Sequence, residues 1–162
     1  MTARQRGLDP QAQLQDALDL SFRFLGDRDR TVAEVRRHLE RRGSEPAAID
    51  GAVAELERQG YLDDARFARR FAEDRRRLDA WGAERIERRL VALGVPPAVA
   101  ADAAGTADAN EELAAAVDLL RRRIGRPPES DRDRERALGL LARRGYELEL
   151  AYDAVRAFER GG

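Results

Sequence analysis

The fold of this chain is decided by three similar stretches: TVAEVRRHLERRG at 31–43, GAERIERRLVALG at 82–94 and RDRERALGLLARRG ending at Gly145. They align without a gap, and the glycines that close them, Gly43, Gly94 and Gly145, are 51 residues apart. A fixed period of this size indicates an array of repeated structural units. Each stretch carries apolar residues four positions apart, which lie on one face of a helix. The closing glycine can adopt the left-handed conformation that ends a helix. The apolar pairs are Val35 with Leu39, Ile86 with Leu90, and Ala137 with Leu141.

Each of these helices has a predicted helix on either side of it. The preceding helices are expected at about 10–25, 63–78 and 110–124, and the following ones begin after each glycine. Their apolar faces are predicted as Leu14, Leu18 (or Ala17), Phe22 and Leu25; Phe67, Phe71 and Leu78; and Leu113, Val117, Leu120 and Ile124. After the glycines, the apolar positions are Ile49, Val53 and Leu56; Val99 and Ala103; and Leu150, Ala154 and Phe158.

The sequence therefore predicts an all-α fold of three tandem three-helix repeats, each resembling a helix-turn-helix module. The expected boundaries are 1–60, 61–106 and 107–162. A module of about 50 residues buries too little surface to be very stable alone, so neighbouring modules should pack end to end. The expected result is an elongated array, whose curvature the sequence does not determine.

The amino-acid composition favours a helical protein and argues against a dedicated duplex-DNA-binding domain. Charged residues make up 38% of the 162 residues and aromatic residues only 6%, which suits helices with solvated faces rather than a β-sandwich or barrel. All 30 basic residues are arginine, and the formal net charge is −1. A dedicated duplex-binding domain usually has a clear basic excess, so the net charge argues mildly against that role.

The same composition argues against an enzyme, a cofactor or a metal site. The chain has no cysteine, which excludes disulfides and thiolate ligands, and only one histidine, His38. There is no phosphate-binding Gly-Lys loop, no Ser/His/Asp set and no HExxH motif, so no catalytic residue is predicted. The polar start lacks the apolar segment of a secretory signal, and no apolar run is long enough to span a membrane. The cytoplasm is the expected location.

Two helix starts carry recognisable capping residues. Thr31 and Glu34 have the spacing of a capping box. Asp63 lies where an N-cap belongs, and Asp64 adds a carboxylate at the first helical position, where the helix dipole favours negative charge. A metal or acid–base role for the two aspartates is the alternative, but adjacent carboxylates at a helix start do not converge on one ligand without other partners. Capping is therefore the favoured interpretation.

The stretch YLDDARFARRFAEDRRR at 61–77, followed by WGAERIERRLVALGV at 81–95, closely resembles the RecX family. Residues Ala17 to Gly60 also look like the amino-terminal repeat of that family, whereas 105–135 shares only the helical pattern. The resemblance implies a protein without enzymatic activity that binds filaments of the RecA recombinase and inhibits their recombinase and ATPase activities. Such a protein would modulate DNA repair, recombination and the SOS response.

Arginines off the predicted buried faces could form a basic stripe across the first two modules. Residues 66–94 contain nine arginines and five acidic residues, a local excess of four. The stripe would face RecA or DNA and comprise Arg36, Arg37, Arg66, Arg69, Arg70, Arg76, Arg77, Arg85, Arg88 and Arg89. The alternative is a solvated face laced with ion pairs between residues four apart, such as Glu84 with Arg88. Trp81, at a turn between helices, is expected to pack against the core rather than to stack on a base.

Three functions stay open at this point. The first is a monomeric regulator that binds the RecA filament, with single-stranded DNA inside the filament as a further candidate partner. The second is a DNA-binding regulator of helix-turn-helix type, which the near-neutral charge disfavours. The third is a scaffold of helical repeats that binds an unrelated protein.

Overall fold

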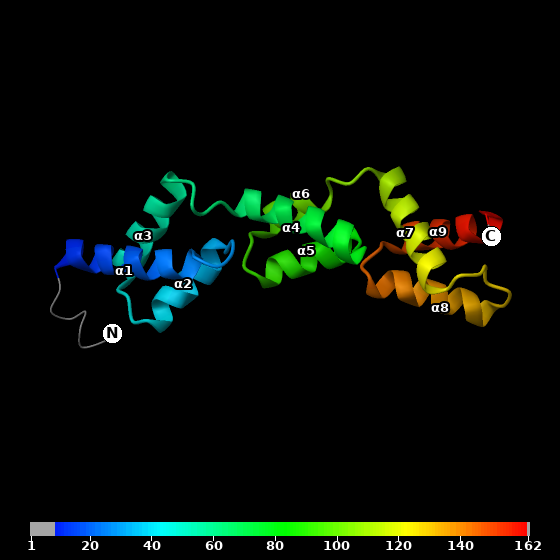
Figure 1. Ribbon diagram of the computed structural model, residues 1–162, viewed down its shortest axis with the longest axis horizontal. Helices are drawn as coiled ribbons and strands as arrows, with labels where there is room; N and C mark the ends of the chain where they lie inside the picture. The colour runs from blue at the N-terminus through cyan, green and yellow to red at the C-terminus, as the bar shows by residue number, and fades with distance from the viewer. Residues whose placement is uncertain (1–8, 162) are drawn as a thin grey trace. The chain divides into compact units, whose positions relative to one another are not determined.

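The computed structural model describes residues 9–161, and all regular secondary structure in this range is helical. The helices are α1 (Pro10–Leu25), α2 (Val32–Arg41), α3 (Pro46–Arg58), α4 (Asp64–Asp79), α5 (Ala83–Ala92), α6 (Pro97–Ala104), α7 (Ala109–Arg123), α8 (Asp131–Arg143) and α9 (Leu148–Gly161) (Figure 1). The predicted all-α fold is confirmed. The helices expected at 10–25, 63–78 and 110–124 are α1, α4 and α7, within one residue at each end.

The repeated pattern marks the positions that are buried. Val35, Ile86 and Ala137 are all 0% exposed, as are Leu39, Leu90 and Leu141 four residues later. These residues lie on α2, α5 and α8, which are the middle helices of the three triplets. The three glycines that follow have positive φ angles of 81°, 93° and 92°. A glycine ends each of these helices because it adopts this conformation without a steric cost.

The chain divides into two compact units. Of the described residues, the first contains 9–67 and Ala92–Pro96, and the second contains Ala68–Val91 and 97–161. The boundary falls within α4, between Phe67 and Ala68, and within α5, between Val91 and its last residue, Ala92.

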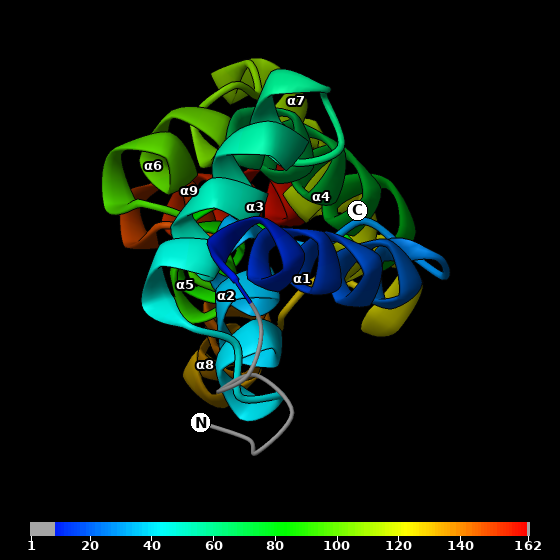
Figure 2. The ribbon, with the colours of Figure 1, turned by 90° about the vertical axis from the view of Figure 1, so that its left-hand side faces the viewer.

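In the first unit, α1, α2 and α3 pack against one another (Figure 2). Their core includes Val35, Leu39, Val53 and Leu56. One expectation for α1 is wrong. Ala17 is buried and Leu14, Leu18 and Leu25 pack against the core as predicted, but Ser21 is buried in place of Phe22, which is 40% exposed. The Ser21 hydroxyl can be buried because it donates a 2.7 Å hydrogen bond to the carbonyl oxygen of Ala17. Small residues on this face let the helices approach closely, and the ring of Phe22 packs edge-on against Tyr61 with 5.2 Å between the ring centres.

In the second unit, α7, α8 and α9 surround a core that includes Leu120, Leu141, Tyr146 and Phe158. Val117 and Leu120 are buried on α7 as predicted, and Leu113 and Ile124 pack at the edge of the same core.

The expectation for the end of α4 is wrong. Ala68 and Ala72 are 0% exposed, but Leu78 is 60% exposed. Leu78 shares a helical face with Phe67 and Phe71, yet it lies in the last turn of α4, where it lines an open pocket instead of a core.

Candidate functional site

The candidate site lies in the second unit, where the start of α5 meets the turn after α8. The amide of Gly82 donates a 2.7 Å hydrogen bond to the carbonyl oxygen of Arg144, and the amide of Glu84 donates a 3.0 Å bond to that of Gly145. A Cβ atom on Gly82 would lie 2.5 Å from the Gly145 oxygen, and one on Gly145 would lie 2.2 Å from Cβ of Arg85. Only glycine at both positions permits this close approach of the two backbones.

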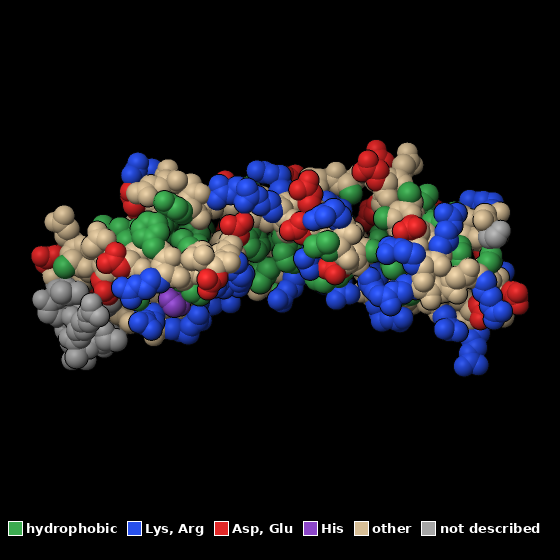
Figure 3. Space-filling view, in the orientation of Figure 1, with side chains coloured by type: hydrophobic (Ala, Val, Ile, Leu, Met, Phe, Trp, Pro, Cys, Tyr) green, Lys and Arg blue, Asp and Glu red, His purple; other side chains and the backbone are tan. Residues whose placement is uncertain are grey.

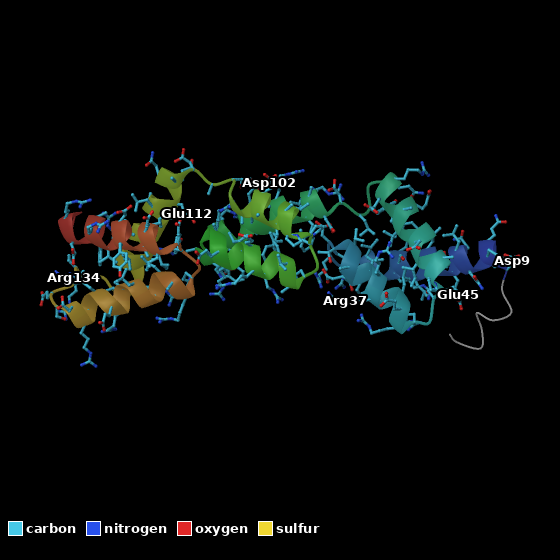
Figure 4. All side chains as sticks on the ribbon, turned by 180° about the vertical axis from the view of Figure 1, so that it is seen from behind. Asp9, Arg37, Glu45, Asp102, Glu112 and Arg134 are labelled. Atoms are coloured by element: carbon cyan, nitrogen blue, oxygen red, sulfur yellow. The ribbon has the colours of Figure 1, made fainter. Side chains whose placement is uncertain are left out.

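Two further contacts hold this junction together. The amide of Ala83 donates a 3.1 Å bond to a carboxylate oxygen of Glu112, in the first turn of α7 (Figure 4). The hydroxyl of Tyr146, a residue only 2% exposed, donates a 2.9 Å bond to the carbonyl oxygen of Ala80. Burial, and then the nearby carboxylate of Glu112, raises the pKa of Tyr146 to about 12. The turn between α4 and α5 is therefore anchored on two sides.

This anchoring fixes the orientation of two arginines. The guanidinium of Arg85 lies 4.2 Å from the ring centre of Trp81 and donates a 3.0 Å bond to the carbonyl oxygen of Arg143. The guanidinium of Arg144 donates a 2.5 Å bond to the carbonyl oxygen of Asp79. Both acceptors are neutral, so neither hydrogen bond cancels the positive charge of its arginine.

Around this turn lies a cavity of about 510 Å³ with a strongly basic lining. Six arginines and a single carboxylate, Asp79, contribute to its wall. We call this cavity the arginine pocket. Its lining residues are Arg75, Arg77, Leu78, Asp79, Ala80, Trp81, Arg85, Leu119, Arg122, Arg123 and Arg144. Arginine side chains gather in this part of the surface, near the start of α5 and the end of α8 (Figure 3).

Some of this charge is paired locally. Arg75 forms an ion pair with Asp79, and Arg122 forms one with Asp118 at 3.0 Å. Arg77 lies 3.7 Å from Asp74, and both side chains are mostly exposed. The pairs of Arg77 and Arg122 are exposed and therefore weak, so an incoming anion could compete for these two guanidinium groups.

The structure brings together only part of the predicted basic stripe. Arg77 and Arg85 line the arginine pocket. Arg36, Arg37 and Arg66 belong to the first unit, whereas Arg69, Arg70, Arg76, Arg88 and Arg89 belong to the second. The stripe as a single binding surface stays a prediction.

Several stripe residues already have partners inside the protein. Arg36 pairs with Asp50 at 2.9 Å, and Arg66 donates a 2.7 Å bond to the carbonyl oxygen of Gly60. Arg76 donates to the carbonyl oxygens of Ala103 and Ala104 near the end of α6, at 3.2 and 2.5 Å. Burial lowers the pKa of Arg76, which acts here as a C-terminal cap of α6. Arg37, Arg69, Arg88 and Arg89 are exposed.

Sequence reasoning missed four arginines of the pocket: Arg75, Arg122, Arg123 and Arg144. The last three are separated from Arg77 and Arg85 by dozens of residues, and only the packing of α7 and α8 against the α4–α5 turn brings them there. The run Arg121–Arg123 at the end of α7 was an available signal, since a cluster of like charges at the end of a helix marks a solvated or ligand-facing position.

The predicted caps have clear structural roles. The hydroxyl of Thr31 accepts a bond from the Glu34 amide, and the Glu34 carboxylate accepts one from the Thr31 amide, which is the capping box. Asp63 accepts a 3.0 Å bond from the amide of Arg66 at the start of α4. Asp64 accepts a 3.0 Å bond from the amide of Val32, and burial raises its pKa.

The described part of the chain shows neither a metal-binding cluster nor a membrane-spanning helix. Within residues 9–161, no three His, Asp or Glu side chains lie close enough together to hold a metal ion. No helix in that range combines the length and apolar character needed to cross a membrane.

Fold and site together define an all-helical protein of three-helix modules with a basic pocket on its second unit. Comparison with known families sharpens this description: residues 17–56 match the first three-helix domain of RecX, and residues 63–103 match the second. The chain belongs to the RecX family.

Relatives and solved structures agree with this assignment. The chain is 32% identical to the regulatory protein RecX of Amycolatopsis mediterranei over 151 residues, covering 92% of this chain and 86% of the relative. It is 34% identical to regulatory protein RecX of Thermus thermophilus, covering 91% of this chain and 95% of the relative. The crystal structure of RecX from Lactobacillus salivarius has the same fold, with a TM-score of 0.84 at 15% identity over 92% of this chain and 98% of that one.

Proposed function

We propose that this protein binds filaments of the RecA recombinase and restrains their recombinase and ATPase activities, and so modulates DNA repair, recombination and the SOS response. Its membership of a family of regulatory proteins supports this role. In this proposal it acts in the cytoplasm as a monomer, without a cofactor and without catalysing a reaction of its own.

The observation that carries the proposal is the concentration of fixed positive charge on a protein whose net charge is only −1. Binding surfaces complementary to an acidic partner steer association and select against wrong partners. The arginine pocket, together with the predicted basic stripe, supplies such surfaces for RecA or for single-stranded DNA held in its filament. The three modules would add their contact areas, and contacts to adjacent filament subunits would perturb filament growth or nucleotide turnover.

The direct test measures the DNA-dependent ATPase and strand exchange of RecA from the same organism, with increasing amounts of this protein. Dose-dependent inhibition of both is expected. No inhibition at any dose overturns the proposed function.

A second step tests the stripe. Charge reversal at Arg66, Arg70 and Arg88 should weaken inhibition, whereas reversal at Arg121, Arg132 and Arg160 changes the net charge equally at exposed positions outside the stripe and the pocket. Equal inhibition by both triple variants would discard the stripe and leave the regulatory function standing. Salt-sensitive binding of bare duplex DNA that depends on its sequence, without an effect on RecA, would favour a helix-turn-helix regulator. Stable binding of a different protein and not RecA would favour a scaffold.

A further inference from the structure

The arginine pocket concentrates more like charge than the fold requires. Its wall carries six arginines and one carboxylate around a cavity of about 510 Å³. Like charges held near one another repel and lower stability. The buried core of the second unit is formed by apolar side chains and Tyr146, and it contains none of the six arginines of the pocket. A bound anion would relieve the repulsion.

Arg85 and Arg144 have the properties of a preformed anion site. Each is held by a neutral carbonyl oxygen, and Arg85 is held as well by the face of Trp81. Their charges remain available while their positions are restricted. Prior ordering of this kind reduces the entropy lost when a ligand binds. Arg77, Arg122 and Arg123 are exposed on the same wall and can move toward a ligand.

The lining also indicates the chemistry of the ligand. A guanidinium group can donate two parallel hydrogen bonds to the oxygens of one phosphate, a geometry that an ammonium group does not offer. The one large aromatic ring of the pocket, Trp81, has Arg85 against it at 4.2 Å, so this face is not free to stack on a base. Leu78, Ala80 and Leu119 are the other apolar lining residues. The charged groups of a ligand, rather than a base, would occupy this space.

A second, smaller pocket continues from the first. Its volume is about 200 Å³, and Arg123 belongs to the wall of both. Arg126 and Arg136 line it together with Ile124, Pro127, Pro128 and one carboxylate, Asp133, so three arginines face one acidic group. Positive charge therefore extends past one cavity, which suits a ligand with several charged groups on one chain.

We propose that the arginine pocket binds a chain of phosphate groups, such as the triphosphate of a nucleotide or the backbone of a nucleic acid strand. Arg85 and Arg144 provide the fixed contacts, and Arg122 and Arg123 close on the ligand from the end of α7. The same pocket contributes to the proposed action on RecA, but phosphate binding is measured on this protein alone, so failure of phosphate binding and failure of RecA inhibition are distinguishable.

The test is titration of the full chain with tripolyphosphate at low ionic strength, followed by calorimetry and by the fluorescence of Trp81. Saturable binding that weakens with added salt is expected. The double variant R122Q/R123Q should bind at least about twentyfold more weakly, since each charge-assisted contact contributes roughly a factor of five to ten. The matched control R121Q/R132Q loses the same net charge at exposed positions outside the pocket and should bind as the native protein does.

A substitution in the opposite direction separates charge from shape. D79N removes the one carboxylate of the pocket and releases Arg75 from its ion pair, so tripolyphosphate should bind several-fold more tightly. Competition by ATP and by a short single-stranded oligonucleotide then identifies the source of the phosphate groups, and displacement by either supports the site.

Three results would overturn the proposal. One is the absence of saturable tripolyphosphate binding by the native protein. Another is an equal loss of affinity in R122Q/R123Q and R121Q/R132Q, which would indicate a nonspecific charge effect. The third is equal displacement by polyglutamate of the same charge, which would indicate an acidic protein segment as the ligand. The melting temperatures of the variants, measured by circular dichroism, verify that each is folded.

Discussion

Two junctions in this protein are built from equivalent contacts, one in each unit. In the first unit the hydroxyl of Thr31 donates a 2.7 Å bond to the carbonyl oxygen of Leu93. In the second unit the amide of Gly82 donates a 2.7 Å bond to that of Arg144. Both the donor residue (31 to 82) and the acceptor residue (93 to 144) are displaced by 51 residues, which is the interval between Gly94 and Gly145.

The equivalence extends to the next residue. The amide of Val32 donates to a carboxylate of Asp64 at the start of α4, and the amide of Ala83, 51 residues later, donates to that of Glu112 at the start of α7. Each junction therefore caps the first amides of a middle helix with a carboxylate from the helix that begins the next triplet.

The side chains at the two junctions differ in character. Gly94 packs against Ala33 and is followed by the buried Val95, whereas Gly145 packs against Arg85 and is followed by the buried Tyr146. The arginine pocket lies at the second junction. The repeat therefore preserves a backbone arrangement, while the side chains around it are free to differ.

The largest expected effect comes from adding one methyl group at each junction. In Gly145→Ala the new Cβ would lie 2.5 and 2.8 Å from backbone atoms of Arg85, at a φ of 92°. We expect the free energy of unfolding of the second unit to fall by about 4 kcal/mol. In Gly94→Ala the nearest backbone atom is 3.6 Å away, although Cβ of Ala33 would lie at 2.2 Å, so a loss of about 2 to 3 kcal/mol is expected.

Urea unfolding followed by Trp81 fluorescence reports the second unit, and circular dichroism reports all helices. Gly60→Ala is the control, because Gly60 has a φ of 81° but nothing within 4 Å of the added Cβ. It should cost only about 1 kcal/mol. Equal losses for all three variants would mean that conformation, and not close packing, limits the junctions.

A second difference between the junctions is the buried phenol of Tyr146, which has no counterpart at Val95. Tyr146→Phe leaves the carbonyl oxygen of Ala80 without its bond and should cost about 1 to 2 kcal/mol at neutral pH. The pKa of Tyr146 is about 12 in the folded protein, against about 10 when unfolded. Between these values the unfolded state has lost the proton that the folded state keeps, so the free energy of unfolding falls as pH rises.

The expected loss of stability between pH 10 and pH 12 is about 2 to 3 kcal/mol from this group. Unfolding of the native protein and of Tyr146→Phe at a series of alkaline pH values checks it. The variant should show a shallower decline, and parallel curves for the two proteins would contradict the assignment to Tyr146.

A smaller effect is expected from the side chain that makes the first junction. Thr31→Val keeps the shape of the residue but removes the bonds to Leu93 and Glu34, which should cost about 1 to 2 kcal/mol. Thr31→Ser retains the hydroxyl and should recover most of this loss. Thermal unfolding by circular dichroism is the measurement. Failure of serine to recover stability would assign the effect to packing of the methyl group.

The smallest effect is expected from an exposed arginine of the pocket. Arg77→Gln removes a guanidinium whose carboxylate neighbour, Asp74, is 3.7 Å away and exposed. The free energy of unfolding of the variant should differ from that of the native protein by less than about 0.5 kcal/mol. Urea denaturation at low and high salt checks this value, and a larger loss would mean that the pocket arginines support the fold.

The repeat made most of the fold predictable. The spacing of Val35 and Leu39, and of their counterparts 51 and 102 residues on, identifies the buried faces of α2, α5 and α8. The glycines identify where these helices end. The exposure of Phe22 and Leu78 was not predictable, because periodicity gives the face of a helix and not which part of that face a neighbour covers.

The arginine pocket was only partly predictable for a related reason. Arg77 and Arg85 lie in segments with an obvious excess of arginine, but Arg122, Arg123 and Arg144 come from the third triplet of helices. Their convergence depends on how that triplet packs against the α4–α5 turn. Local pattern contains no information on this long-range packing.

The main-chain hydrogen bonds at the Gly145 junction also bear on how such a protein can diverge. Every amino acid except proline, which lacks the amide proton, supplies both a backbone amide and a carbonyl. A junction held by main-chain hydrogen bonds therefore restricts the sequence mainly at positions where a side chain would clash, such as Gly82 and Gly145. Substitutions at exposed positions elsewhere do not disturb the hydrogen bonds of this junction. Homologues with few identical residues could thus keep one scaffold while each adapts its surface to its own partner.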